Sequence, residues 1–368
     1  MYSFITNGPF KLENGQELKS LKISYHTYGK LNVDESNVVW VCHALTANSD
    51  VFDWWPGLFG EGKTFDPNKY FIVCANALGS CYGSTGPASS KSNREPLLEE
   101  FPQLTTRDLA NAHDLLRQRL GIRSVKTLIG ASLGGQQALE WSIINPSAFQ
   151  ELILIATNAR HSAYGIALNE SQRQAIYSDP TYGKGNIKGG KAGLSVARQI
   201  AMVSYRSYDG YVATQTDEED RSSDFKASSY QRYQGKKLAD RFCAYSYVTL
   251  SQAMDSHNVG RNRNGLNQAL KNVKARTLII GIRSDNLFPT NEQRLLHNLI
   301  EWADYAEIDS QFGHDGFLIE TDQLSVIIEG FISNNLSRFR PTVFKTTTKK
   351  SELMNLAINK QAPQNVVV

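Results

Sequence analysis

The sequence lacks the features that would place a chain in a membrane or on a nucleic acid. No apolar stretch approaches the roughly 20 residues that a bilayer-spanning helix needs. Residues 1–6 contain no basic region and no apolar segment, so we expect no signal peptide. The net charge is only +3 over 368 residues, which indicates neither nucleic acid nor an anionic membrane as a partner. We therefore expect a globular protein whose partners are small molecules.

Cysteine is scarce and shows no pairing pattern. The four cysteines are Cys42, Cys74, Cys81 and Cys243, and none belongs to a Cys-x-x-Cys motif. Two of them, Cys42 and Cys74, lie in apolar runs, where a free cysteine behaves as a small hydrophobic residue. We expect no zinc or other metal site, no disulfide framework, no permanently bound cofactor and a reduced, cytoplasmic setting.

The stretch around Ser132 has the pattern of a catalytic turn. An apolar run at 125–129 ends in Gly-Ala-Ser-Leu-Gly-Gly at 130–135 and passes directly into a helix-forming segment. This is the layout of a nucleophile elbow, in which a serine lies on a tight strand-to-helix turn. Glycine is needed at 130 and 134 because a side chain there would clash. The N–H of Leu133 would then point toward charge that develops on a substrate oxygen. The alternative is an ordinary glycine-rich turn around a buried serine.

Two earlier strands end in loops that suit a ligand site. The run at 37–42 is almost entirely apolar and is followed by His43-Ala-Leu-Thr. A loop that leaves a central strand of an open α/β sheet is a common place for binding groups. We assign the second oxyanion donor to the backbone N–H of Leu45. His43 precedes the nucleophile in the chain, and we expect it to orient this loop rather than to act as base. The run at 70–75 leads into a glycine- and serine-rich loop at 76–87, which matches no phosphate-binding motif.

The pattern changes between residues 160 and 262. This stretch is polar and helical and contains no apolar strand run, so we expect a helical lid inserted into an α/β core formed by 1–159 and 263–340. An amphipathic helix is predicted over 193–207, with Arg198 and Tyr205 on one side. An arginine on a partly apolar face needs a carboxylate partner, either from the protein or from a substrate. Residues 341–368 are predicted to form a loosely attached tail with a short helix at 350–358.

Two further side chains complete a candidate triad. Apolar strand patterns return after the lid, and Asp285 and His314 each follow one of them. Ser132, Asp285 and His314 thus occur in the chain order that is typical of the α/β-hydrolase fold, a mostly parallel sheet with helices on both faces. In such a triad the histidine takes the proton of the serine, and the acid orients the imidazole. This pattern does not tell whether water or a second substrate accepts the acyl group.

The motifs resemble those of the homoserine O-acetyltransferase family of methionine biosynthesis. The resemblance rests on residues 43–46, 79–87, 130–141, 284–289 and 313–318, which are collinear with that family from about residue 8 to residue 333. It implies an α/β-hydrolase-fold enzyme that moves acetyl from acetyl-CoA, a co-substrate, to L-homoserine by a ping-pong route. It also implies a homodimer joined through the lid helices.

The resemblance gives the candidate residues specific roles. It implies Ser132 as nucleophile, Asp285 as the acid of the triad and His314 as base. It further implies that Arg198 binds the carboxylate of the amino acid, with Tyr205 nearby, and that Asp315 holds its amino group or polar end. Four alternatives stay open: a succinyl donor, serine as acceptor, an esterase or thioesterase that uses water, and a catalytically silent protein that only binds ligands.

Overall fold

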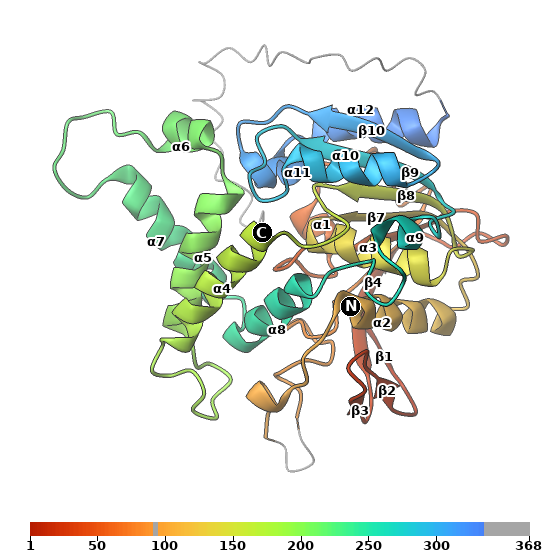
Figure 1. The fold of residues 1–368 in the computed structure, drawn as a ribbon, viewed down its shortest axis with the longest axis horizontal. Helices are drawn as coiled ribbons and strands as arrows, with labels where there is room; N and C mark the ends of the chain where they lie inside the picture. Colours follow the sequence, from red (N-terminus) through yellow and green to blue (C-terminus); the bar gives the residue numbers. More distant parts are fainter. Residues whose placement is uncertain (91–94, 335–368) are drawn as a thin grey trace.

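The computed structural model describes residues 1–90 and 95–334, and these form a mostly parallel sheet flanked by helices (Figure 1). The main sheet has the strand order β1-β4-β6-β5-β7-β8-β9-β10. Strands β1 and β4 are antiparallel to their neighbours, and the six strands from β6 to β10 in this order run parallel. The strands are β1 (Tyr2–Ile5), β2 (Phe10–Lys11), β3 (Glu17–Leu18), β4 (Lys22–Tyr28), β5 (Val38–Cys42), β6 (Phe71–Ala75), β7 (Val125–Ala131), β8 (Phe149–Ile155), β9 (Arg276–Ile282) and β10 (Ala303–Ile308).

Helices connect the parallel strands and cover the sheet. They are α1 (Val51–Trp54), α2 (Thr106–Arg119), α3 (Leu133–Ile144), α4 (Ala163–Tyr177), α5 (Lys191–Tyr205), α6 (Tyr208–Gln215), α7 (Lys226–Ala239), α8 (Ala244–Asp255), α9 (Leu266–Leu270), α10 (Thr290–Leu299), α11 (Gly316–Ile319) and α12 (Thr321–Ile332), with short 3₁₀ turns at Leu98–Glu100 and Gly313–Asp315. This architecture confirms the predicted α/β-hydrolase fold class.

Local sequence explains the central elements. All five residues of β5 are buried, as expected for a parallel strand covered on both faces. Helix α2 begins at a reciprocal cap, because the Thr105 side chain accepts from the Asp108 N–H while the Asp108 carboxylate accepts from the Thr105 N–H. The last strand of the sheet, β10, begins at Ala303. Its residues lie half-buried at the sheet edge, which weakens the apolar pattern there.

Helices α4 to α8 occupy the interval between β8 and β9. Figure 1 shows them together beside the sheet, with α6 and α7 farthest from it. The acidic run at 217–220 lies in the loop between α6 and α7, where residues 218–220 are exposed. The predicted tail at 341–368, with its short helix, lies outside the described residues.

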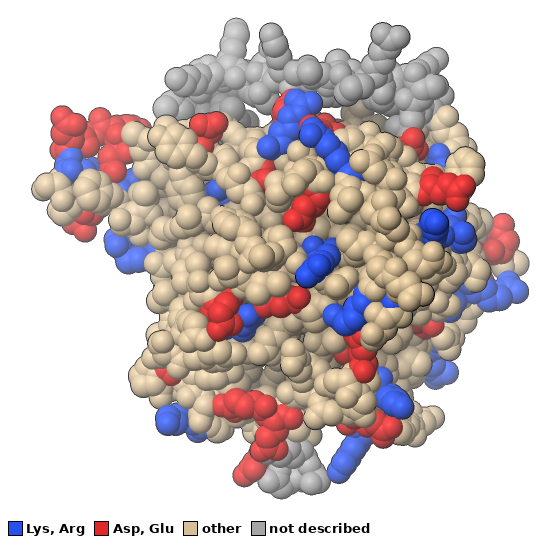
Figure 2. Space-filling model, in the orientation of Figure 1, with Lys and Arg blue, Asp and Glu red and all other residues tan. Residues whose placement is uncertain are grey.

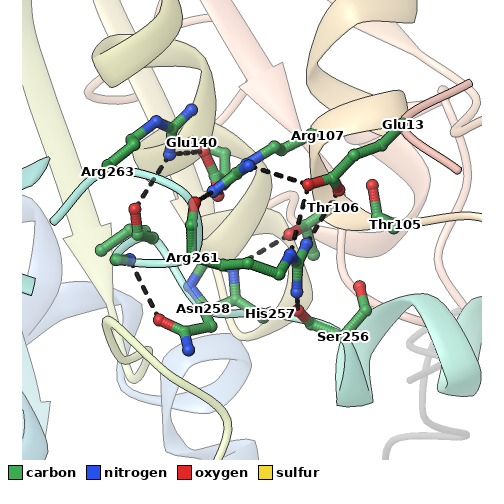
Figure 3. Close-up of polar contacts among 12 residues, drawn as sticks. Glu13, Thr105, Thr106, Arg107, Glu140, Ser256, His257, Asn258, Arg261 and Arg263 are labelled. Atoms are coloured by element: carbon green, nitrogen blue, oxygen red, sulfur yellow. Dashed lines mark hydrogen bonds and ion pairs between the residues drawn. The ribbon is translucent and has the colours of Figure 1, made fainter. Parts of the chain in front are cut away.

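A buried ion-pair network fastens the N-terminal segment to helices α2 and α3 (Figure 3). Glu140 of α3 is fully buried. Its carboxylate pairs with Arg107 Nε at 3.2 Å and with Arg263 Nη1 at 2.6 Å. The Glu13 carboxylate pairs with Arg107 Nη1 and Arg261 Nη2, both at 2.8 Å. Since Arg261 and Arg263 follow α8, the network also fixes the chain where it returns from α4–α8 to the sheet.

Candidate active site

Ser132 lies on a strained turn between β7 and α3. Its backbone φ is +57° and ψ is −126°, a conformation that residues other than glycine rarely adopt. The neighbouring glycines make this turn possible: a Cβ at Gly130 would lie 2.2 Å from the Gly134 carbonyl oxygen, and one at Gly134 would lie 2.1 Å from that of Cys42. The structure therefore has the backbone geometry that the Gly-x-Ser-x-Gly pattern predicts.

Two groups from β8 and its C-terminal extension hold the strained serine. The Ser132 N–H donates to the Ile155 carbonyl at 3.0 Å. The Thr157 hydroxyl donates to the Ser132 carbonyl at 2.9 Å. Such strain persists only where the surroundings over-determine the conformation, and these two bonds supply that constraint.

Asp285 and His314 form a buried pair at the ends of β9 and β10. His314 Nδ1 lies 2.6 Å from Asp285 Oδ2, and both side chains are almost fully buried. The other carboxylate oxygen, Oδ1, accepts from the backbone N–H groups of Leu287 and Phe288 at 2.8 and 2.9 Å. These bonds orient the carboxylate, and the carboxylate orients the imidazole so that Nε2 is left to act on a substrate.

Aromatic rings surround the His314 imidazole. The rings of Phe288, Phe317 and Tyr205 have centroids at 5.1, 5.5 and 5.7 Å from that of His314. They give the imidazole largely apolar surroundings, in which electrostatic interactions are stronger than in water. Among the described residues, no hydrogen bond joins the Ser132 hydroxyl to His314; such bonds are often long before a substrate is bound.

The N–H groups of Leu45 and Leu133 are both available. Leu133 is the first residue of α3, so its N–H has no partner within the helix, and the N–H of Leu45 has no acceptor among the described residues. The loop that carries Leu45 is held by His43, whose Nδ1 contacts the Ala44 carbonyl at 2.8 Å and whose Nε2 accepts from the Ala77 N–H at 2.9 Å. Burial lowers the pKa of His43 to about 4, so the ring is neutral. Both ring nitrogens are used to orient the loop.

Arg198 of α5 is a buried cation that has no carboxylate partner among the described residues. Its side chain is only 4 % exposed, no ion pair to a described carboxylate is formed, and Nη1 has no hydrogen-bond partner. The guanidinium lies 5.2 Å from the ring centroid of Tyr205, and the Tyr205 ring also packs against that of His314. The sequence left open whether a protein carboxylate would pair with Arg198, and none of the described carboxylates does.

Asp315 has a partner that the sequence analysis missed. Arg206 Nε, at the end of α5, lies 2.8 Å from Asp315 Oδ2, although its N–H direction makes this an ion pair rather than a hydrogen bond. Asp315 Oδ1 is buried and has no partner. Arg206 directly follows Tyr205 in the Tyr-Arg-Ser segment, which was the available signal for it. The carboxylate thus keeps one oxygen free in the site.

Within residues 1–90 and 95–334, no group of three or more histidine, cysteine or acidic side chains could hold a metal ion. In the same part of the chain, no helix is long and apolar enough to cross a membrane. Basic and acidic side chains are interspersed on the face shown in Figure 2, without a broad patch of one sign.

Comparison with known proteins agrees with this geometry. The α/β hydrolase fold family matches residues 37–321. The homoserine O-acetyltransferase of Cyclobacterium marinum is 47% identical over 333 residues, which cover 90% of this chain and 95% of that protein. The crystal structure of homoserine O-acetyltransferase from Bacillus anthracis superposes with a TM-score of 0.82 at 24% identity, covering 93% of this chain and 98% of that one. The structure of esterase E22 has a TM-score of 0.79 at 21% identity, covering 90% of this chain and 99% of that one.

The two structural likenesses establish only the fold, because both identities are below 25%. The sequence relative is much closer and spans nearly the whole of both chains. The chain belongs to the homoserine O-acetyltransferase family of the α/β hydrolase fold.

Proposed function

We propose that this protein transfers an acetyl group from acetyl-CoA to the hydroxyl of L-homoserine through a Ser132 acyl-enzyme. The observation that carries the choice of acceptor is Arg198, a buried cation without a carboxylate partner among the described residues, near the Asp285–His314 pair. Burial of an unpaired charge is costly, so this position favours a ligand that brings its own carboxylate. Water, the acceptor of an esterase, brings none.

In the first half-reaction, His314 takes the Ser132 proton as the hydroxyl oxygen attacks the thioester carbonyl. Asp285 stabilises the imidazolium that forms. The N–H groups of Leu45 and Leu133 stabilise the oxyanion, an effect worth about 3 kcal/mol per donor. The C–S bond then breaks, and the thiolate of CoA leaves with the proton from His314. Acetyl remains on Ser132 as an ester.

In the second half-reaction, the acceptor amino acid occupies the space between α5 and the His314 loop. The Arg198 guanidinium binds its carboxylate, and the free Oδ1 of Asp315 accepts from its ammonium group. Tyr205 packs against the guanidinium and fixes its direction. His314 removes the proton of the homoserine hydroxyl, whose oxygen attacks the acetyl ester. The bond between the acetyl carbon and the Ser132 oxygen then breaks, and His314 returns the proton to Ser132.

The test measures thiol release from acetyl-CoA with and without L-homoserine, with the product identified by mass spectrometry. We expect one thiol per active site without acceptor and continuous turnover with it. Turnover at full rate without homoserine would instead establish a thioesterase. A panel of succinyl-CoA and L-serine separates the related donor and acceptor choices. Ser132→Ala should reduce turnover by several orders of magnitude, whereas a silent binding protein has no activity to lose.

The lid and its assembly are part of the same proposal. We infer a core of 1–159 and 263–340 with an inserted lid at 160–262, a homodimer through the lid helices, and a cytoplasmic setting. Exposed apolar side chains on α5, α6 and α7 support the dimer; they are Val196, Val203, Tyr208, Val212 and Tyr233. Light scattering after gel filtration should give twice the monomer mass of 41.1 kDa. Val203→Glu should lower that mass.

A further inference from the structure

A cavity lies where helices between β8 and β9 meet the 76–87 loop at Cys81. It has a volume of about 430 Å³ and is bounded by the 76–87 loop, the start of α5 and the turn between α7 and α8. Its walls include Cys81 and Phe242, and its basic lining residues are Lys188, Lys191 and Arg241. An adjoining hollow of about 570 Å³ shares both lysines and adds Lys236. The two form one region, whose lining residues all lie between 179 and 244 except Cys81.

The charge of this region is positive. Its four basic side chains, Lys188, Lys191, Lys236 and Arg241, face two acidic ones, Asp179 and Asp240. Asp240 pairs with Lys191 at 2.8 Å and with Lys236, which lowers its pKa to about 2. Asp179 is occupied by hydrogen bonds from Thr181 and from the Gly193 N–H. Lys188 and Arg241 have no carboxylate partner among the described residues.

Arg241 connects this region to the catalytic loop. Its Nη1 donates to the Thr46 carbonyl at 2.7 Å and to the Tyr82 hydroxyl at 2.5 Å. Its Nε is buried and has no partner. Thr46 is the residue after Leu45, so Arg241, a lining residue of the cavity, bonds to the neighbour of the proposed oxyanion donor.

We propose that the cavity formed around Arg241, Lys188 and Lys191 binds the phosphate-bearing end of the acyl thioester donor. This inference rests on the proposed function, because it places one part of the acetyl-CoA used there. Ammonium groups bind phosphate as point charges, and guanidinium groups bind it through paired N–H donors. The apolar wall at Ile187 and Phe242 suits the uncharged arm between the phosphates and the thioester. The donor thus enters beside α5 and α8, whereas the amino acid binds between Arg198 and Asp315.

The test compares two donors of the same acetyl group, acetyl-CoA and p-nitrophenyl acetate, which has no phosphate. The variant Lys188→Glu/Lys191→Glu is measured beside Lys226→Glu, a charge-reversal control at the N-terminal end of α7. We expect the ratio of kcat/KM for acetyl-CoA to that for p-nitrophenyl acetate to fall at least about ten-fold in the double variant only. The effect should shrink as salt is added, because exposed charges are screened.

The variant Lys188→Gln/Lys191→Gln removes the two positive charges but places no new negative charge beside Asp240. Its ratio of kcat/KM values should fall as well. An unchanged donor ratio in both double variants, or an equal change in Lys226→Glu, would overturn the proposed phosphate site and leave the proposed function intact. If wild-type Ser132 is acetylated by p-nitrophenyl acetate but not by acetyl-CoA, the donor in the proposed function is wrong, and this inference fails with it.

Discussion

The hydroxyl of Thr157 donates a hydrogen bond of 2.9 Å to the backbone carbonyl of Ser132. Thr157 follows β8, and its side chain also fills the space in which a Cβ at Gly135 would lie. It therefore constrains the nucleophile turn from outside the turn's own sequence. Its effect on Ser132 is positional, because it contacts the serine backbone and not the reacting hydroxyl.

Thr157→Val removes this hydrogen bond while it keeps the shape of the side chain. We expect kcat to fall about ten-fold with little change in the KM for acetyl-CoA, because small displacements of a nucleophile are costly. Thr157→Ser, which keeps the hydroxyl, should restore kcat. Steady-state kinetics of the two variants check this prediction. A valine variant with normal kcat would show that the Ser132 turn keeps its conformation without the Thr157 hydrogen bond.

Arg198→Gln should separate the two half-reactions. Acetyl-enzyme formation should persist, whereas the KM for L-homoserine should rise roughly 100-fold, because a charge-assisted contact to the carboxylate is lost. Mass spectrometry of the acyl-enzyme and steady-state kinetics measure the two steps. Arg232→Gln, on the exposed face of α7, is the control. Equal losses in both half-reactions would contradict carboxylate binding by Arg198.

Arg206→Gln tests the ion pair with Asp315. Without the guanidinium, the carboxylate loses the partner that fixes Oδ2, and its free Oδ1 is no longer held toward the acceptor. We expect the KM for L-homoserine to rise about ten-fold with acetyl-enzyme formation unchanged. Arg206→Lys should recover part of this loss because it keeps the charge. A normal KM in the glutamine variant would mean that the backbone turn at Gly313–Asp315 orients the Asp315 carboxylate without Arg206.

Glu140→Gln should destabilise the fold rather than change the chemistry directly. The substitution leaves the guanidinium groups of Arg107 and Arg263 without their shared buried carboxylate. Breaking a buried pair in this way costs about 3 kcal/mol. Urea denaturation should show the loss, while kcat/KM below the unfolding transition should stay near that of the wild type. Stability unchanged within about 0.5 kcal/mol would mean that the network contributes no net energy.

Buried histidines make stability depend on pH. Burial lowers the pKa of His113, whose Nε2 bonds to Gln137 at 3.0 Å, to about 4 from the ordinary 6.5. The unfolded chain therefore binds more protons between pH 6.5 and pH 4, and stability is lost as the pH falls through this window. In His113→Asn, the free energy of unfolding should decrease less steeply there, by up to about 1.4 kcal/mol per pH unit. Urea denaturation at pH 7, 6 and 5 measures this slope, and an unchanged slope would exclude His113 as its source.

The sequence by itself indicated the tight turn at Ser132 and the candidate triad. Gly130 and Gly134 avoid the backbone clashes that side chains would make at this turn, and the strand before it and the helix after it are predictable from their own residues. The order of Ser132, Asp285 and His314 indicated the fold, because each follows a strand and parallel strands end at one edge of a sheet.

Only the tertiary structure decided which groups meet across long sequence separations. Whether Arg198 pairs with a protein carboxylate depends on every element packed around α5, and the pairing of Arg206 with Asp315 joins the end of α5 to the His314 loop. The contact of Arg241 with Thr46 spans 195 residues. The physical reason is that side-chain periodicity shows which face of an element is buried, whereas the partner on that face is set by packing. Charged side chains have no preference for a particular partner until packing brings them together.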